Sequence, residues 1–504
     1  MIASRNRLWP IGAAVFLASA ALALLHSDYR FDGTWVLQVI ARMHDGDVLY
    51  RDVFAGVPPL TFAIGFGATA IFGTELAVLK VLIAATIALS WVAGARILRR
   101  FTGSSKFDVP LAIAVIACGQ PEIASFYQPL ANVFLLLSID AATAGNPIRD
   151  SFSLSRRAWL VGLWCGLAFL TKHTIGAYAL TASAAVLIAT AERPRNWSRD
   201  ARMIFATGIM CAVTVTMGML PVVVSGGWRS FVDYAFLGKG TYLAIGGVPY
   251  FDELGALARS LTSFSRGWSV HVAKSLALLV PPVAVMAAVV VARYRRAVPE
   301  TAVVAGALVV AELAGLYPRA DLAHVIPIVP GLLVAIVLAW HVLVSQSVAR
   351  VWLRTAATLI IAADIGIRFA AAGAALADPD RITSTVPHLG RLVIPRAQVD
   401  VAAAAARRLQ DAAGGAPLFL LVPDAGFYYL ISGIRNPTPF DYPLKPAFGS
   451  TGMADTIERL AHGDLSRVCM KPLAGLMAPD ALQTYIQTHM TQGEDLGTCI
   501  LYRR

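Results

Sequence analysis

The chain has 504 residues, of which 57% are hydrophobic and only 14% are charged, and its net charge is +11. Soluble proteins average about 25% charged residues. This composition therefore excludes a soluble enzyme, a disordered tail protein and a nucleic-acid-binding domain. The apolar residues form runs of about 16–24 residues, the length that a helix needs to cross a bilayer core of about 30 Å. The composition predicts a polytopic α-helical membrane protein, a class that includes transporters, channels and membrane enzymes.

About eleven membrane spans are expected when the clustered arginines and lysines of the short connections are placed in the cytoplasm. Because Arg5 and Arg7 precede the first apolar run, the N-terminus is placed inside. The apolar run 58–73 is placed on the outer surface, since a crossing there would put the basic cluster 96–106 outside. The expected spans are about 8–25, 75–96, 108–121, 128–145, 158–171, 174–191, 203–225, 271–292, 300–317, 323–344 and 351–373.

This arrangement predicts a transmembrane domain over residues 1–373, with two long outer loops at 26–74 and 226–270. Residues 374–504 are then an extracytoplasmic domain, in which short strands and helices alternate as in a small α/β fold. Cys469 and Cys499 lie in this domain and are able to pair if it is extracytoplasmic. Two buried strand cysteines look the same in sequence, so the pairing stays open. The expected strands are 417–422, 467–470 and 498–502, and the expected helices are 425–431, 453–462 and 479–489.

Four ionisable residues fall inside expected spans, toward their outer ends, although a charge at the membrane centre costs about 2.5–3.5 kcal/mol. Asp364 and Arg368 share a helix face and are expected to pair. Lys80 is expected to extend its amine to the interface. Glu312 has no partner on its own helix, which suggests a polar cavity that opens outward. A water-filled transporter vestibule would give the same signal.

Several segments of the first 345 residues form a pattern. The first outer loop contains Asp32, then Gly46-Asp-Val-Leu-Tyr50-Arg-Asp52, then Val57-Pro-Pro-Leu60. Residues 162–172 read GLWCGLAFLTK, and Tyr317-Pro-Arg319 precedes His324 and Pro327. Together these segments resemble the GT-C superfamily of integral membrane glycosyltransferases, of the protein O-mannosyltransferase and aminoarabinose transferase type. The segments Pro423–Leu430 and Arg435-Asn-Pro-Thr also resemble the periplasmic tail of bacterial members.

The sequence departs from this family pattern at two positions. Asp32 is followed by Gly33, where the family often has a second acidic residue. Val57 stands where the family has a lysine before the two prolines, so one expected phosphate contact is absent. The family's second acidic residue, near the next outer loop, has Glu122 and Asn132 as candidate counterparts.

The resemblance implies a GT-C-like enzyme with juxtamembrane helices in its first outer loop. Such an enzyme transfers a sugar from a polyprenyl-phosphate carrier to an envelope lipid, glycan or protein on the extracytoplasmic face. The attacking hydroxyl must lose a proton, and a carboxylate within hydrogen-bond reach accepts it. Asp32 is the expected base and Asp28 the alternative. Asp32 equally fits the N-cap of the helix that continues to about Met43.

The leaving lipid phosphate needs positively charged donors. Lys172 fits either such a donor or an interfacial lysine that contacts ordinary lipid phosphate. Arg319 fits either such a donor or a loop arginine that pairs with Asp321. Asp52 also fits a turn or cap residue. The expected donor contacts are Lys172, Arg319, His324 and Arg266, and the expected further substrate contacts are Glu122, Glu312, Tyr50 and Asp52.

The sequence has no His, Cys or Asp cluster with metal-ligand spacing, no P-loop and no G-x-S-x-G elbow. No cofactor is expected, and a metal requirement stays open. The expected partners are the polyprenyl-phosphate sugar donor, membrane lipids and an envelope acceptor, and no nucleic acid. The expected location is the plasma (inner) membrane. Two alternatives remain: a transporter or flippase of a lipid-linked sugar, and a non-catalytic envelope-assembly protein of the same fold.

Overall fold

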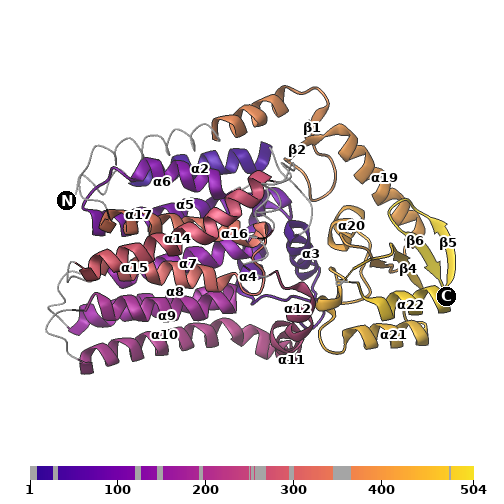
Figure 1. The fold of residues 1–504 in the computed structure, drawn as a ribbon. Coiled ribbons are helices and arrows are strands. Elements are labelled where there is room, and N and C mark those ends of the chain that lie inside the picture. Colours follow the sequence, from indigo (N-terminus) through magenta and orange to yellow (C-terminus); the bar gives the residue numbers. More distant parts are fainter. Residues whose placement is uncertain are drawn as a thin grey trace. The chain divides into compact units, whose positions relative to one another are not determined.

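The computed structural model describes residues 8–25, 32–119, 126–144, 151–191, 197–248, 250, 255, 268–294, 300–343, 365–475 and 478–504. These residues are mainly helical and group into two compact units (Figure 1). The helical unit consists of Met1–Ala23, Leu82–Gly218 and Val248–Ala372, and the mixed unit of Leu24–Val81, Met219–Gly247 and Gly373–Arg504. The expected first outer loop, 26–74, thus groups with the C-terminal residues, whereas the expected second outer loop, 226–270, is divided between the two units after residue 247.

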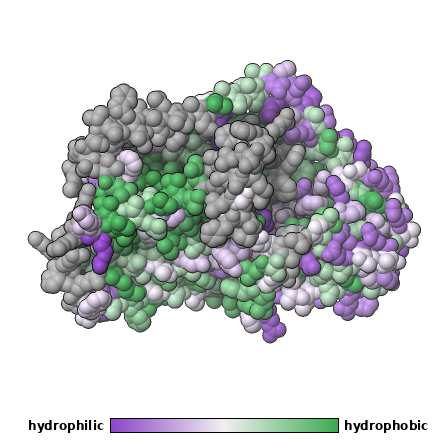
Figure 2. Space-filling model, viewed as in Figure 1, coloured by the Kyte–Doolittle hydropathy of each residue, from purple (hydrophilic) through white to green (hydrophobic). Residues whose placement is uncertain are grey.

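The helical unit is built from long apolar helices, and apolar side chains gather on the part of it that is visible in Figure 2. Among the described residues, five helices are long and apolar enough to cross a membrane. Helix α9 packs against α7, α8 and α15, and α17 packs against α14 and α15. The helices are α2 (Leu8–Leu25), α5 (Leu76–Thr102), α6 (Asp108–Gly119), α7 (Tyr127–Thr143), α8 (Ser151–Thr171), α9 (His173–Ala189), α10 (Trp197–Val224), α14 (Trp268–Tyr294), α15 (Glu300–Gly315), α16 (Leu322–Val325), η2 (Ile326–Ile328) and α17 (Val329–Leu343).

Two glycines allow α8 to approach α10 closely. A Cβ atom on Gly162 would lie 2.4 Å from the carbonyl oxygen of Thr207, and one on Gly166 would lie 2.6 Å from the Cβ atom of Thr214. Small residues four apart on one helix face let two helix backbones meet in this way in membranes. The glycine spacing in residues 162–172 therefore has a packing function.

Helices cover each of the first ten expected spans, and the eleventh lies mostly outside the described residues, with a helix at Ile365–Ala377. The number of membrane crossings stays a prediction. Helix α4 (Leu60–Phe72) has 13 residues, about 20 Å at 1.5 Å per residue, which is short for a crossing of about 30 Å. This length agrees with a surface position for the run 58–73. The expected partner of Arg368, Asp364, is outside the described residues.

The mixed unit contains a four-stranded sheet with the strand order β3-β4-β6-β5, in which β3 and β4 are parallel and the other pairs antiparallel. A separate antiparallel pair joins β1 and β2. The elements are α3 (Asp32–His44), α4, α11 (Trp228–Val232), η1 (Asp233–Leu237), α12 (Lys239–Gly246), β1 (Arg381–Thr383), β2 (Val393–Pro395), α19 (Arg396–Ala413), β3 (Phe419–Leu421), α20 (Ala425–Ser432), η3 (Lys445–Phe448), α21 (Gly452–His462), β4 (Arg467–Met470), α22 (Asp480–His489), β5 (Thr491–Asp495) and β6 (Ile500–Arg503).

The expected α/β pattern of the C-terminal residues is confirmed, with boundaries shifted by one or two residues and several additional elements. Strand β6 begins at Ile500 rather than at residue 498, because residues 496–498 form a turn in which the Gly497 N–H donates to Asp495. The expectation did not include α19, β5 or the pair of β1 and β2.

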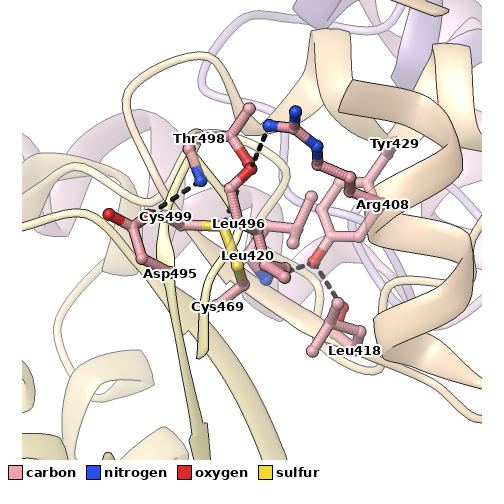
Figure 3. Close-up of a disulfide and its surroundings, with 10 residues drawn as sticks. Arg408, Leu418, Leu420, Tyr429, Cys469, Asp495, Leu496, Thr498 and Cys499 are labelled. Carbon is pink, nitrogen blue, oxygen red and sulfur yellow. Dashed lines mark hydrogen bonds between the residues drawn. A yellow bond between two sulfur atoms is a disulfide. The ribbon is translucent and has the colours of Figure 1, made fainter. Parts of the chain in front are cut away.

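The core of the sheet contains the disulfide between Cys469 on β4 and Cys499, whose Cα atoms are 5.4 Å apart (Figure 3). Pairing of these cysteines, which the sequence left open, is therefore found. Beside it the Tyr429 hydroxyl accepts from the Leu420 N–H and donates to the Leu418 carbonyl, which joins α20 to β3.

Candidate functional site

The structure describes only part of the expected site. Asp28, Glu122 and Arg266 lie outside the described residues. Asp32 is the first residue of α3, but the position of its side chain is outside them as well. The residues that can be placed fall in two regions, one in each unit, and each is described separately.

In the helical unit, Lys172 is the single residue that separates α8 from α9. Its backbone is extended, with φ −149° and ψ 106°, so the chain reverses there in a tight junction. Gly176 makes this possible, because a Cβ atom on it would lie 2.3 Å from the Cα atom of Phe169. The junction aims the lysine side chain toward the ends of α7 and α15.

The amine of Lys172 is held by two oxygen atoms. It donates to the Gly315 carbonyl, at 3.3 Å, where α15 ends. It also lies 3.0 Å from the side-chain oxygen of Gln128 at the start of α7, in the amide orientation that satisfies both atoms of Gln128. The Gln128 nitrogen then donates to the Ala323 carbonyl at 3.3 Å. Gln128 thus links Lys172 to α16.

Asp321 organises the loop that joins α15 to α16. Its carboxylate accepts from the Arg319 guanidinium at 2.7 Å and contacts His324 Nδ1 at 2.6 Å. Burial alone would raise the pKa of Asp321, but the hydrogen bond from His324 and the charges of His324 and Arg319 outweigh it, so the pKa lies well below its usual value. The backbone of this loop is held in turn by Val248, which exchanges hydrogen bonds with Pro318 and Ala320.

These contacts define a basic cluster, made of Gln128, Lys172, Arg319, Asp321 and His324. It brings together three of the four expected donor contacts within one unit. Among the described residues, the cluster contains the cationic side chains of Lys172 and Arg319 together with the carboxylate of Asp321. Lysine and arginine side chains are donors for an anionic group such as a phosphate. The pairing of Arg319 with Asp321, one of the two interpretations of Arg319, is found.

Glu312 and Asn132 are among the polar side chains of the helical unit that are buried without hydrogen-bond partners in the described residues. Glu312 on α15 is 1% exposed, and both of its carboxylate oxygens lack a hydrogen bond. It lies against Gly331 of α17, where a Cβ atom would come within 2.0 Å of its Oε1 atom. Asn132 on α7 is 2% exposed, and both amide atoms lack partners. Asn132 follows Gln128 by one helical turn, so both lie on the same face of α7.

In the mixed unit, α3 is fixed by buried polar contacts to the C-terminal chain. Arg42 donates to the Asp441 carboxylate at 3.2 Å and to the Thr438 carbonyl at 2.9 Å. Asp441 is completely buried. Burial raises its pKa, while Arg42, Asn436 and Gln38 oppose this rise by donating to the carboxylate. These contacts determine the position of the helix that begins with Asp32.

Backbone packing fixes α3 further. A Cβ atom on Gly426 of α20 would lie 3.1 Å from the Cα atom of Trp35, so a larger residue at position 426 would push the two helices apart. The indole ring of Trp35 contacts Phe54, Phe62 and Tyr442, with ring centroids 6.1–6.3 Å apart.

Tyr50 and Asp52, two of the expected substrate contacts, hold the loop that follows α3. Tyr50 is completely buried with φ 68°, and its hydroxyl donates to the Val57 carbonyl. Asp52 accepts from the Val48 N–H at 2.9 Å and from Arg51 at 2.8 Å. The hydrogen bond from Arg51 lowers the pKa of Asp52 against a small effect of burial.

Sequence reasoning missed Gln128 and the partners of α3. A glutamine at the start of an apolar helix is a weak signal by itself, and Asp441 is separated from Arg42 by 399 positions. Within the described ranges, no three His, Cys, Asp or Glu side chains are placed to hold a metal ion.

Known structures share this fold. No family model and no curated protein matches the sequence. The structure of ArnT from Cupriavidus metallidurans bound to undecaprenyl phosphate aligns with 99% of this chain and 98% of its own, at 14% identity and a TM-score of 0.58. The apo structure of ArnT aligns over the same extent with a TM-score of 0.44.

A second protein has the same architecture. The arabinofuranosyltransferase AftD from Mycobacteria aligns with 99% of this chain, at 14% identity and a TM-score of 0.51, and this chain spans 40% of AftD. The resemblance found in the sequence is therefore confirmed at the level of the fold. Over nearly its whole length, the chain has the GT-C fold of these membrane glycosyltransferases.

Proposed function

We propose that this protein is an integral membrane glycosyltransferase that transfers a sugar from a polyprenyl-phosphate carrier to an envelope lipid, glycan or protein. The observation that carries the proposal is the basic cluster, which lies in a fold shared over 99% of the chain with ArnT. ArnT was solved with undecaprenyl phosphate, so that fold accommodates a lipid phosphate. The cluster supplies the charge that such a phosphate requires.

In the proposed reaction, Lys172 and Arg319 bind the carrier phosphate and stabilise the negative charge that develops as the sugar leaves. The Gly315 carbonyl and Gln128 hold the amine of Lys172 in place. Asp321 orients Arg319 and His324. Gln128, the Gly315 carbonyl and Asp321 come from α7, α15 and the loop before α16. Because they hold Lys172, Arg319 and His324 from three sides, these donor groups are preorganised rather than mobile.

The proposed base is Asp32, with Asp28 as the alternative. It accepts the proton of the acceptor hydroxyl as that hydroxyl attacks the anomeric carbon, and the carrier phosphate leaves with the bonding electron pair. Attack opposite the leaving group inverts the anomeric centre. The buried contacts of Gln38 and Arg42 support this role by holding α3 in one position.

The proposed orientation places the N-terminus in the cytoplasm and residues 374–504 outside, in a multi-pass protein of the plasma membrane. The disulfide between Cys469 and Cys499 supports an outside position, because disulfides persist in oxidising compartments. Phe440 is 4% exposed, so a cysteine at position 440 would be shielded by the fold. A cysteine introduced at the exposed position Val401 should be labelled by an impermeant thiol reagent in intact cells. Labelling only after lysis would contradict this orientation.

A transporter of the same lipid-linked sugar is the second candidate, and one observation favours it. Glu312 is buried without a hydrogen-bond partner among the described residues, as in many intramembrane acids of transport pathways. Proteoliposomes loaded with a labelled carrier-linked sugar distinguish the two candidates. Transfer of the label to an acceptor supports the enzyme, and movement of intact donor across the bilayer without transfer supports the transporter.

The decisive experiment uses the purified full chain in the same proteoliposomes. We expect Asp32→Asn to abolish transfer without loss of folded protein, and Lys172→Gln to raise the KM for the donor about tenfold, since it removes one charge-assisted hydrogen bond. Lys106→Gln is the matched control, because Lys106 is an exposed lysine of the helical unit outside the cluster. Full activity of Asp32→Asn would refute the assignment of the base, and an unchanged KM in Lys172→Gln would refute the phosphate contact.

A further inference from the structure

The mixed unit contains an open cleft of about 680 Å³ that the proposed reaction does not use. Its walls are the turn after α3, the segments 416–417 and 435–439, and the segment 459–467 that connects α21 to β4. Sites for small ligands commonly have volumes of about 300–1,000 Å³. The cleft is therefore large enough for a ligand.

Arginine side chains dominate the charge of the cleft. Its lining contains five arginines and three aspartates, which gives it a net charge of +2. A guanidinium group presents several donors in a plane and matches the two oxygens of a carboxylate or a phosphate. The charged lining residues are Arg42, Arg51, Arg435, Arg459, Arg467, Asp47, Asp52 and Asp464.

Most of these charges already have partners. Arg42 is paired with Asp47 at 2.6 Å and Arg51 with Asp52 at 2.8 Å. The guanidinium of Arg467 donates to the last carbonyls of α19. These contacts explain the position of three arginines without any ligand.

Arg435 and Arg459 are different. Neither side chain makes a hydrogen bond or an ion pair with any residue of the described ranges, although both line the cleft. The lining carboxylate that has no arginine partner there is Asp464, which is exposed. Two guanidinium groups thus remain available to a ligand, against a single carboxylate that is able to accept hydrogen bonds from sugar hydroxyls.

The wall that carries Arg435 is rigid. The Asn436 side chain accepts from the Thr438 N–H at 2.9 Å and donates to Asp441 at 2.7 Å, and the Thr438 hydroxyl accepts from the Phe440 N–H. Pro437 and Pro439 restrict the same turn. A preformed wall reduces the entropy lost on binding, so the backbone that presents Arg435 needs no ordering when a ligand arrives.

We infer that this cleft binds an anionic saccharide, a sugar that carries a phosphate or a carboxylate group. Arg435 and Arg459 bind the anionic group, the proline faces contact the sugar ring, and Asp464 accepts from hydroxyls. The inference rests on the proposed function in one respect, because it takes this saccharide to be the acceptor of the transferred sugar.

Binding to the purified full chain, measured by calorimetry, tests the site without any transfer reaction. The probes are trigalacturonate for the carboxylate, glucosamine 1-phosphate for the phosphate, neutral maltotriose, and inorganic phosphate alone. We expect at least one anionic saccharide to bind more tightly than maltotriose and inorganic phosphate, and to bind more weakly at 0.5 M salt. Equal binding of maltotriose, or binding of inorganic phosphate as tight as that of the saccharides, would overturn the inference.

The variant Arg435→Gln/Arg459→Gln should bind the anionic probe about tenfold or more weakly than the wild type, because two charge-assisted hydrogen bonds are lost. It should fold normally, since neither guanidinium has a partner in the described structure. Arg407→Gln is the matched control: Arg407 is an exposed arginine of α19 outside the cleft. Unchanged binding in the double variant, or an equal loss in the control, would contradict the site.

The assignment to the acceptor has its own readout. With an anionic acceptor, the double variant should raise the KM for the acceptor about tenfold and leave the KM for the donor and the kcat unchanged. An unchanged acceptor KM would refute the acceptor role while leaving the transferase proposal intact. If the wild-type protein binds the anionic saccharide but transfers no sugar, the proposed function fails and the binding site stands.

Discussion

Two buried carboxylates, one in each unit, show opposite solutions to the same physical problem. Asp441 in the mixed unit is completely buried and accepts hydrogen bonds from Arg42, Asn436 and Gln38. Glu312 in the helical unit is 1% exposed and has no hydrogen-bond partner among the described residues. Burying a carboxyl group without hydrogen-bond partners costs free energy. The contacts of Asp441 therefore stabilise the fold, whereas Glu312 contributes little to its stability.

The comparison indicates which buried polar side chains are held in place by hydrogen bonds and which are not. In the mixed unit, polar contacts between residues distant in sequence fix α3 and the cleft wall. In the helical unit, close glycine contacts let apolar helices pack together, and Asp108 and Asp140 pair with arginines, but Glu312 has no such partner among the described residues. Substitutions of the two carboxylates should therefore differ in size and in kind.

The largest effect is expected from Asp441→Ala. It leaves the Arg42 guanidinium buried beside an empty site, and the removal of one partner of a buried ion pair costs about 3–5 kcal/mol. Chemical denaturation of the detergent-solubilised protein measures the loss. Asp47→Ala is the control, because Asp47 is the more exposed partner of Arg42, and it should cost about 1 kcal/mol or less. If the two variants lose the same free energy of unfolding, the buried pair of Arg42 and Asp441 does not stabilise the fold more than the more exposed pair of Arg42 and Asp47.

The next largest loss of stability is expected from removal of the disulfide. The double variant Cys469→Ala/Cys499→Ala opens a loop of 30 residues, and the chain-entropy estimate for such a loop is about 3–4 kcal/mol. The same denaturation experiment with and without a reductant checks it. The reductant should destabilise the wild-type protein and leave the double variant unchanged; sensitivity of the double variant would point to another target.

Asp321→Asn should have a smaller effect that depends on pH. The pKa of Asp321 is lowered in the folded protein. Its ionised form therefore stabilises the fold above the unfolded value of about 3.9, and this stabilisation is lost as the pH falls through the folded value. The variant should be about 1 kcal/mol less stable than the wild type at pH 7. The difference should stay constant above about pH 4 and shrink as the pH falls below the unfolded pKa toward the lowered folded pKa of Asp321. A difference that stays constant below about pH 4 would mean that the lost interaction does not involve the charge.

The smallest effect is expected from Glu312→Gln. The substitution replaces a carboxyl group that has no hydrogen-bond partner in the described structure with an amide of nearly the same shape, so the free energy of unfolding should change by less than about 1 kcal/mol. Asp441→Asn is the matched isosteric change and should cost more, because Arg42 loses its buried counter-charge. A large loss in Glu312→Gln would reveal a partner for Glu312 and would erase the contrast between the two carboxylates.

The sequence predicted the elements whose pattern is local. The apolar runs coincide with helices, and β3, β4, α20, α21 and α22 lie where alternation and turn residues indicated them. Strand β5 was missed because all five of its residues, Thr491–Asp495, are exposed, so it has no apolar alternation. Helix α19 was also missed, although its residues Arg396–Ala413 are rich in alanine, a strong helix former.

The candidate site was predictable only in part, for a different reason. Lys172, Arg319 and His324 were found because charges beside apolar runs are conspicuous, and the structure brings them into one cluster. Gln128 and Asp441 act through contacts with residues far away in sequence. No local pattern reports such contacts, since the same glutamine or aspartate would look alike on a solvated surface.

The close approach of Gly426 to Trp35 has a practical consequence for anyone who dissects this protein. A fragment cut near residue 374 would expose the face of α20 that α3 covers and would deprive Asp441 of its guanidinium. A soluble fragment for crystallography should instead carry residues 32–57 on a linker. Grafting the C-terminal residues of a homologue would require the segment that matches residues 32–57 to be exchanged along with them.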